Sequence, residues 1–110
     1  MAIRFWLTPS GRSPVEEFLG GMSQSVRADF FDAVNLLLAG EVLTMPLSRN
    51  LASVKLGLYE LRLKDRTGIY RFFYFIKRAN GIYFVHALKK KTQALPNKDI
   101  ALIRVRLREL

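Results

Sequence analysis

Three strand-like segments follow one another in the second half of the chain, and only short turn-forming stretches separate them. Residues 58–64, "LYELRLK", alternate strictly between apolar and polar side chains, which is the two-residue period of a strand with one buried face. Residues 69–77, "IYRFFYFIK", are apolar at both parities, as in a central strand covered on both faces. The turns "DRTG" and "RANG" and a third segment, "IYFVHALKK" at residues 82–90, complete the pattern of an antiparallel meander.

The first forty residues predict a strand and two helices. "AIRFWL" at residues 2–7 is rich in large apolar side chains and is predicted to be a strand. Ser13, Pro14 and Glu16 have the spacing of a capped helix start. A second helix is predicted over residues 25–39, where apolar residues recur at helical spacing. The two helices form a hairpin whose apolar face needs a sheet to cover it.

The rest of the chain completes an α+β pattern. Residues 41–57 contain scattered leucines among turn formers and are predicted to be mostly connection. After Pro96, a helix is predicted from Lys98 to the last residue. The order β-α-α-β-β-β-α predicts an α+β fold, with the helical hairpin packed on a small, mainly antiparallel sheet and a helix at the C-terminus. Residues 1–110 are expected to form a single domain, because this length supplies one core and is too short for two.

Positive charge is concentrated in the C-terminal half. The formal net charge is +9, and residues 55–110 carry fourteen of the eighteen basic residues but only four of the nine acidic ones. This asymmetry indicates an anionic partner, with nucleic acid the first candidate and an acidic protein segment the second. A basic surface that only aids solubility is the remaining reading. Because the sequence has no cysteine, no signal-peptide pattern and no apolar run of membrane-spanning length, we expect a soluble, cytoplasmic protein without a membrane partner.

The residue inventory excludes several common catalytic sites. A single histidine rules out a two-histidine acid/base pair and a multi-histidine metal site. The acidic residues form no local cluster with metal-ligand spacing, and no glycine-rich phosphate loop is present. We therefore expect neither a metal nor another cofactor. The remaining candidates are the arginines, lysines and tyrosines of the meander.

The three arginines of the meander differ in their predicted surroundings. Arg71 lies within an otherwise hydrophobic strand, where an unpaired charge is costly. It therefore either pairs with Glu60 or Asp65, or directs its guanidinium at a phosphate. Arg62 lies on the polar face of its strand and has the same two readings. Arg66 falls in the turn, where a solvated residue is a simpler reading than a catalyst.

The histidine and two tyrosines each have a structural and a functional reading. His86 is predicted to share a strand face with apolar neighbours, which favours a half-buried structural role over proton transfer; these neighbours are Ile82, Phe84 and Leu88. Tyr70 and Tyr74 lie among phenylalanines and either fill the core or stack on a base at the rim of the sheet.

Lys89, Lys90 and Lys91 form a run that strand geometry divides. Successive side chains of a strand point to opposite faces, so at most one or two of these lysines enter any single site. Such a run is usually solvated surface. Its strand also carries His86, however, and the neighbouring strand carries Arg71, which strengthens the phosphate-binding reading.

Residues 57–107, "GLYELRLKDRTGIYRFFYFIKRANGIYFVHALKKKTQALPNKDIALIRVRL", resemble the HigB-like, phage-derived branch of the RelE/ParE toxin superfamily. The matching pattern is "GLYELR", then "YR" with aromatic residues, then "HALKKKTQ" and a proline before the last helix. The resemblance implies a RelE-like domain and a ribosome-dependent endonuclease that cuts mRNA without a metal. In that chemistry a ribose 2′-hydroxyl attacks the neighbouring phosphate.

The resemblance also implies roles for individual residues. Arg62 and Arg71 would hold the scissile phosphate, Lys90 would donate or accept a proton, and His86 is a further catalytic candidate. RNA or ribosome contacts would come from Lys64, Arg66, Tyr70, Tyr74, Lys89 and Lys91. The chain departs from the RelE pattern at two points. Glu60 stands where RelE-type enzymes carry a basic residue, and no tyrosine follows Lys91.

The partners follow from the same resemblance. A toxin of this branch acts on the ribosome and its mRNA, and it is inhibited by a helix-turn-helix antitoxin encoded by an adjacent gene. Contact with operator DNA would occur only through that antitoxin. Two alternatives stay open from the residues: a ParE-like inhibitor of DNA gyrase with the same fold, and a catalytically inert basic binding domain.

Overall fold

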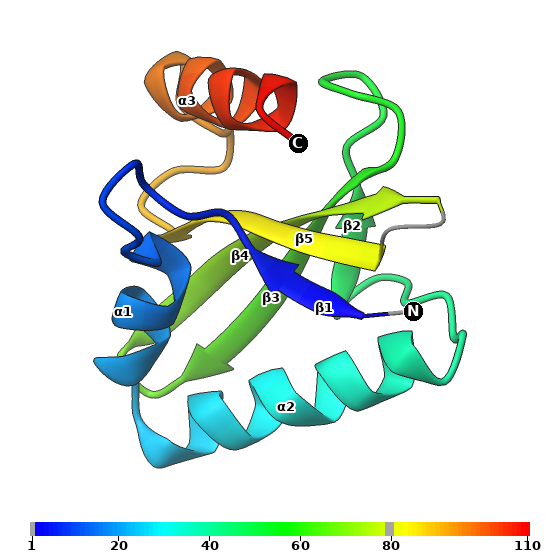
Figure 1. Ribbon diagram of the computed structural model, residues 1–110. Helices are drawn as coiled ribbons and strands as arrows, with labels where there is room; N and C mark the ends of the chain where they lie inside the picture. The colour runs from blue at the N-terminus through cyan, green and yellow to red at the C-terminus, as the bar shows by residue number, and fades with distance from the viewer. Residues whose placement is uncertain (1, 79–80) are drawn as a thin grey trace.

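The computed structural model describes residues 2–78 and 81–110, which form one five-stranded sheet with helices on both of its faces (Figure 1). The sheet has the order β1-β5-β4-β3-β2, and its strands are β1 (Ile3–Phe5), β2 (Ser48–Asn50), β3 (Leu58–Asp65), β4 (Gly68–Lys77) and β5 (Gly81–Lys89). β1 runs parallel to β5, and all other neighbours are antiparallel. The predicted α+β fold with a mainly antiparallel sheet is confirmed.

All three predicted helices are present on this sheet. The helices are α1 (Pro14–Gly20), α2 (Gln24–Leu38) and α3 (Asn97–Arg108). α1 and α2 each begin at a serine whose hydroxyl accepts an amide N–H of the first turn, which satisfies a donor that the helix itself leaves free. α1 and α2 pack on one face of the sheet and α3 packs on the other (Figure 1).

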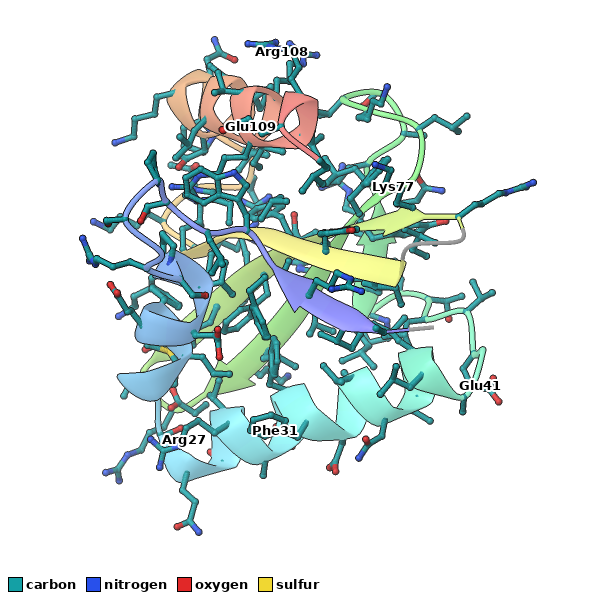
Figure 2. All side chains as sticks on the ribbon, viewed as in Figure 1. Arg27, Phe31, Glu41, Lys77, Arg108 and Glu109 are labelled. Atoms are coloured by element: carbon teal, nitrogen blue, oxygen red, sulfur yellow. The ribbon has the colours of Figure 1, made fainter. Side chains whose placement is uncertain are left out.

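The central strand β4 buries side chains on both faces. Phe72 packs towards α1 and α2, and its ring centroid lies 5.1 Å from that of Phe30. Phe73 packs on the opposite face in the core that includes Ile103 of α3. This two-sided burial explains why the sequence of β4 is apolar at both parities. Arg108, by contrast, projects from α3 away from the sheet (Figure 2).

Tight turns connect the meander. β3 and β4 are joined by a two-residue turn in which Asp65 Oδ1 accepts the Thr67 amide N–H at 2.7 Å. The predicted turn "RANG" includes residues 79 and 80, which lie outside the described residues. Gly81, where β5 begins, has a φ of +114°, and a Cβ atom there would lie 2.2 Å from the Ala2 carbonyl oxygen. Only glycine therefore lets the chain before β1 approach so closely.

The sequence does not predict β2, which lies within the stretch assigned to connection. Its three residues pair with Tyr59–Leu61 of β3, and three residues are too few for a two-residue period to be visible. Ser48 is 2% exposed, and its hydroxyl lies 2.7 Å from that of Tyr74. This short strand is thus held by a tertiary contact that sequence periodicity does not reveal.

A β-bulge in β5 decides which residues face α3. Phe73 pairs with His86 whereas Tyr74 pairs with Phe84, so Val85 is the extra residue. The prediction that His86 and Phe84 share a face is therefore wrong. Phe84 lies in the core beneath α1 and α2, whereas His86 stacks on Phe73 on the α3 side.

Candidate functional site

Four cations of the meander come together on the α3 face of the sheet. The strand register places Arg62 opposite Arg71, and Lys64 opposite Ile69. Lys90 follows β5, and its amide N–H donates to the Ile69 carbonyl oxygen at 2.8 Å. Because residues two apart in a strand point to the same side, the side chains of Arg62, Lys64, Arg71 and Lys90 share one face. We call this set the basic face.

Glu60 forms ion pairs with two of these cations, Arg62 and Arg71. Arg71 Nη2 lies 2.6 Å from Glu60 Oε1, and Arg62 Nε lies 3.3 Å from Glu60 Oε2. The side chains of Glu60 and Arg71 are 1% and 2% exposed, whereas that of Arg62 is 21% exposed. Of the two readings of Arg71, the ion pair with Glu60 is therefore the one present in the structure. Arg62 is the member of the trio that reaches the surface.

The trio keeps a net positive charge next to solvent. It combines two guanidinium groups with one carboxylate, and Arg71 also lies over the ring of Phe73, 5.5 Å from its centroid. A buried carboxylate of this kind needs charge-assisted hydrogen bonds, because taking an ion out of water costs several kcal/mol. Lys64 is exposed and Lys90 is half-buried beside the trio. The basic face is thus a suitable place for a phosphate.

The three consecutive lysines are divided as strand geometry predicts. Lys89 Nζ lies over the ring of Tyr70, 5.9 Å from its centroid and on the α1 side of the sheet, so Lys89 and Lys90 point to opposite faces. Lys90 Nζ donates to Gln93 Oε1 at 3.2 Å. Lys91 is exposed beyond the end of β5. Only Lys90 belongs to the basic face.

The two tyrosines lie in the core beneath α1 and α2. Tyr70 is 8% exposed and packs edge-on against Phe18. Tyr74 is 1% exposed, and burial raises the pKa of its hydroxyl, although the hydrogen bond with Ser48 opposes this shift. Neither ring presents a face on which a base could stack. Arg66 is exposed in the turn between β3 and β4, apart from the basic face.

His86 connects the sheet to the first turn of α3. Its Nε2 lies 2.8 Å from Asp99 Oδ1, and its ring stacks on Phe73 at 5.8 Å between centroids. Burial lowers the pKa of His86, the hydrogen bond and charge of Asp99 raise it, and the charge of Arg106 lowers it. The net direction is downward, so a neutral ring is favoured near pH 7. This geometry matches the half-buried structural reading of His86.

Three side chains that contact these residues were not predicted. Gln93 and Asp99 hold Lys90 and His86, and Arg106 Nη1 donates to the Val85 carbonyl oxygen at the bulge, at 2.7 Å. Gln93 meets Lys90 through a local contact three residues along the chain, whereas Asp99 and Arg106 reach the meander because α3 folds back over the sheet. The one available signal was the placement of Gln93 directly after the lysine run and of Asp99 in the first turn of the last helix.

No group of three or more His, Cys, Asp or Glu side chains within residues 2–78 and 81–110 is placed to hold a metal ion. In the same part of the chain, no helix combines the length and the apolar character needed to cross a membrane.

A match to a family model places this chain in the RelE-like class of toxins from toxin–antitoxin systems. More specifically, the family described as phage derived protein Gp49-like (DUF891) matches residues 17–108, and the chain belongs to this family. Members are commonly the toxin of a toxin–antitoxin pair, which implies a cognate antitoxin. A comparison with curated proteins gave no match.

Proposed function

We propose that this protein is a HigB-like toxin of a type II toxin–antitoxin pair that acts in the cytoplasm as a ribosome-dependent, metal-independent mRNA endonuclease. The observation that supports this proposal best is the basic face. Lys64 and Lys90 share this face with a trio in which Arg71 and Glu60 are buried and Arg62 reaches the surface. Such a site can bind a phosphodiester and stabilise the additional negative charge of its transition state.

The proposed reaction is an internal transfer at phosphorus. The ribose 2′-oxygen forms a bond to the adjacent phosphorus and loses its proton to a solvent water molecule, while the bond from phosphorus to the 5′-oxygen breaks. The products are a cyclic phosphate and a 5′-hydroxyl. Arg62 stays charged, so it serves as an electrostatic ligand of the non-bridging oxygens and not as a base. Lys90 supplies the proton to the departing 5′-oxygen.

Arg71 acts in this proposal as a positioning residue. Its contact of 2.6 Å with Glu60 Oε1 fixes the carboxylate, and the other carboxylate oxygen holds Arg62 Nε. The two terminal nitrogens of Arg62 then remain available for a phosphate. This arrangement also gives a role to the acidic residue that departs from the RelE pattern.

The test is induction of the protein in growing cells, followed by mapping of mRNA 5′ ends. We expect growth arrest with cuts phased to codons in translated messages. Single Arg62→Ala and Lys90→Ala variants should each reduce cutting by at least about 100-fold, the size typical of a lost transition-state donor or proton donor. Arg108→Ala is the matched control, because it removes an exposed cation that projects away from the sheet.

Three outcomes would contradict the proposal. Full toxicity of an Arg62→Ala/Lys90→Ala double variant would remove the site assignment. Growth arrest with intact messages and a DNA-damage response would favour the gyrase inhibitor. Absence of any growth defect would favour the inert binding domain.

A further inference from the structure

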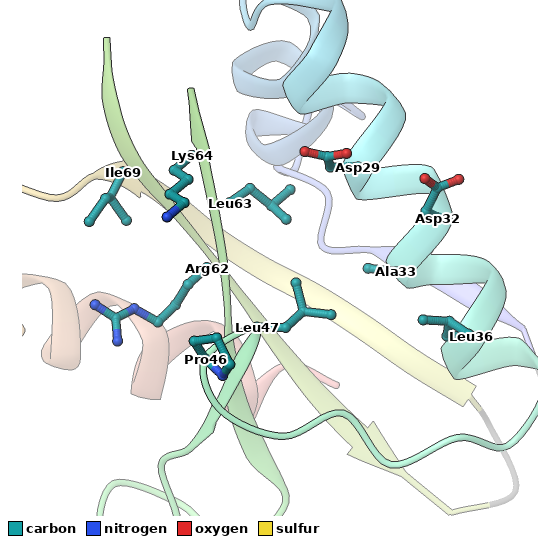
Figure 3. A pocket seen from close by; sticks show the side chains of 10 residues that line it. All are labelled: Asp29, Asp32, Ala33, Leu36, Pro46, Leu47, Arg62, Leu63, Lys64 and Ile69. Carbon is teal, nitrogen blue, oxygen red and sulfur yellow. The ribbon is translucent and has the colours of Figure 1, made fainter. Parts of the chain in front are cut away.

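The outer edge of β3 is only partly covered. β2 pairs with Tyr59–Leu61, but β3 continues to Asp65. Beyond β2, a cavity of about 610 Å³ lies between this edge and α2, and Pro46 and Leu47 close one end of it (Figure 3). We call this cavity the edge groove. The residues that line it include Asp29, Asp32 and Leu36 of α2 and Arg62, Leu63 and Lys64 of β3.

The backbone of β3 is oriented to accept a further strand at the edge groove. The Arg62 amide N–H points outward and donates to the Leu47 carbonyl oxygen at 2.8 Å. Because backbone groups two residues apart in a strand point to the same side, the amide and carbonyl of Lys64 face the groove. A strand edge of this kind is a template for pairing with an extended peptide.

The side chains of the groove differ on the two faces of β3. Figure 3 shows Asp29, Asp32 and Leu36 on one side, where Leu63 also points, and Arg62 and Lys64 on the other. A strand laid along β3 directs alternate residues to these two sides. Its residues facing α2 would meet apolar surface and two carboxylates, and those on the opposite side would meet two cations. The groove therefore fits a peptide in which apolar or basic residues alternate with acidic ones.

Two other occupants fit this charge pattern poorly. RNA would bring its phosphates against Asp29 and Asp32. A second copy of this chain, paired antiparallel through β3, would place Arg62 and Lys64 of both copies on one face, where like charges repel.

We infer that the edge groove receives a strand of the cognate antitoxin, which would cover Arg62 and Lys64 and so block the basic face. This inference rests on the proposed toxin function for its choice of partner. It explains inhibition by direct masking, since Arg62 belongs to both the groove and the Glu60 trio.

The test uses the helix-turn-helix protein encoded beside this chain and the variant Leu36→Glu. Leu38→Glu is the matched control, because Leu36 and Leu38 are both 44% exposed on α2 and only Leu36 lines the groove. We expect Leu36→Glu to weaken binding by at least about 30-fold, as for a central interface residue, and Leu38→Glu to change it by less than about 3-fold. Leu36→Glu should also stay toxic when expressed alone but escape neutralisation by the antitoxin.

Hydrogen exchange provides a second readout that does not depend on variants. Formation of the complex should slow exchange of the Lys64 amide, as expected for a new strand pair. Unchanged exchange at Lys64, equal losses for Leu36→Glu and Leu38→Glu, or failure of the neighbouring protein to bind would overturn the inference. A loss of toxicity in Leu36→Glu with normal antitoxin binding would assign the groove to the toxin's target instead. Toxicity of the wild-type chain tests the proposed function separately, because binding is measured without it.

Discussion

Replacement of Glu60 by glutamine should destabilise the fold substantially although it changes a single functional group. The carboxylate is 1% exposed, accepts a hydrogen bond from Arg71, which is 2% exposed, and forms an ion pair with Arg62. Removing one partner of a buried pair costs about 3–5 kcal/mol, because the other charge is left uncompensated. Glutamine keeps one acceptor oxygen at similar volume, so we expect the lower end, about 3 kcal/mol.

That loss is large for a chain of 110 residues. Typical stabilities of 0.05–0.15 kcal/mol per residue give a free energy of unfolding of about 11 kcal/mol, so about a quarter would be lost. At about 4 °C per kcal/mol, the Tm would fall by about 12 °C. Urea unfolding followed by circular dichroism measures the first quantity and a thermal scan the second. Glu41→Gln is the control, because Glu41 is exposed after α2 (Figure 2) and should change stability by less than about 0.5 kcal/mol.

A double variant separates the loss of charge balance from a general loss of packing. Glu60→Gln combined with Arg71→Met removes both charges of the buried Glu60–Arg71 ion pair. The double variant leaves no uncompensated buried charge at either position, so it should recover at least about half of the loss. A Glu60→Gln protein within about 0.5 kcal/mol of wild type would refute the reasoning, as would a double variant less stable than Glu60→Gln alone.

The remaining predictions concern pH, backbone space and metal dependence. Because burial lowers the pKa of His86 in the folded chain, the unfolded chain binds more protons below its ordinary value of about 6.5, and stability should fall as pH drops through that region. His86→Gln should flatten this part of the pH–stability curve in urea titrations; identical curves would contradict it. Gly81→Ala should lower the free energy of unfolding by at least about 2 kcal/mol, because the new Cβ would meet the Ala2 backbone at a positive φ. Gly20→Ala, whose Cβ would have nothing within 4 Å, should be close to neutral in a thermal scan. On purified ribosomes, this protein should still cut mRNA after EDTA has removed transition metals and Mg²⁺ has been added back to the level that ribosomes need. A requirement for an additional transition metal would contradict the proposed chemistry.

The meander was predictable because its signals are local. Alternation in β3 and apolar character at both parities in β4 report directly on how many faces are buried. The bulge at Val85 was not predictable in the same way. One extra residue shifts the parity of everything after it, and its carbonyl is held by Arg106 of α3, 21 residues further along the chain. The side on which His86 lies was therefore decided by tertiary packing.

The residues of the candidate site were also predictable only in part. Strand alternation placed Arg62 and Lys90 among the candidates, and the family resemblance added Lys64. The alternative of an ion pair between Arg71 and Glu60 followed from the sequence alone. Burial decided between the alternatives for Arg71 and for the two tyrosines. Burial depends on which face α1, α2 and α3 each cover, and no single strand sequence contains that information.

The proposed toxin activity and the proposed antitoxin binding share a single side chain, that of Arg62. Its Nε forms an ion pair with Glu60, its backbone N–H donates a hydrogen bond to the Leu47 carbonyl oxygen, and its side chain lines the edge groove. If the antitoxin strand and the phosphodiester both need this guanidinium, each must lower the affinity for the other by the same factor, since coupling between two ligands is reciprocal. Ribosomes carrying mRNA should then weaken antitoxin binding to wild-type toxin. The same ribosomes should have a smaller effect on Arg62→Ala, because that variant lacks the shared contact.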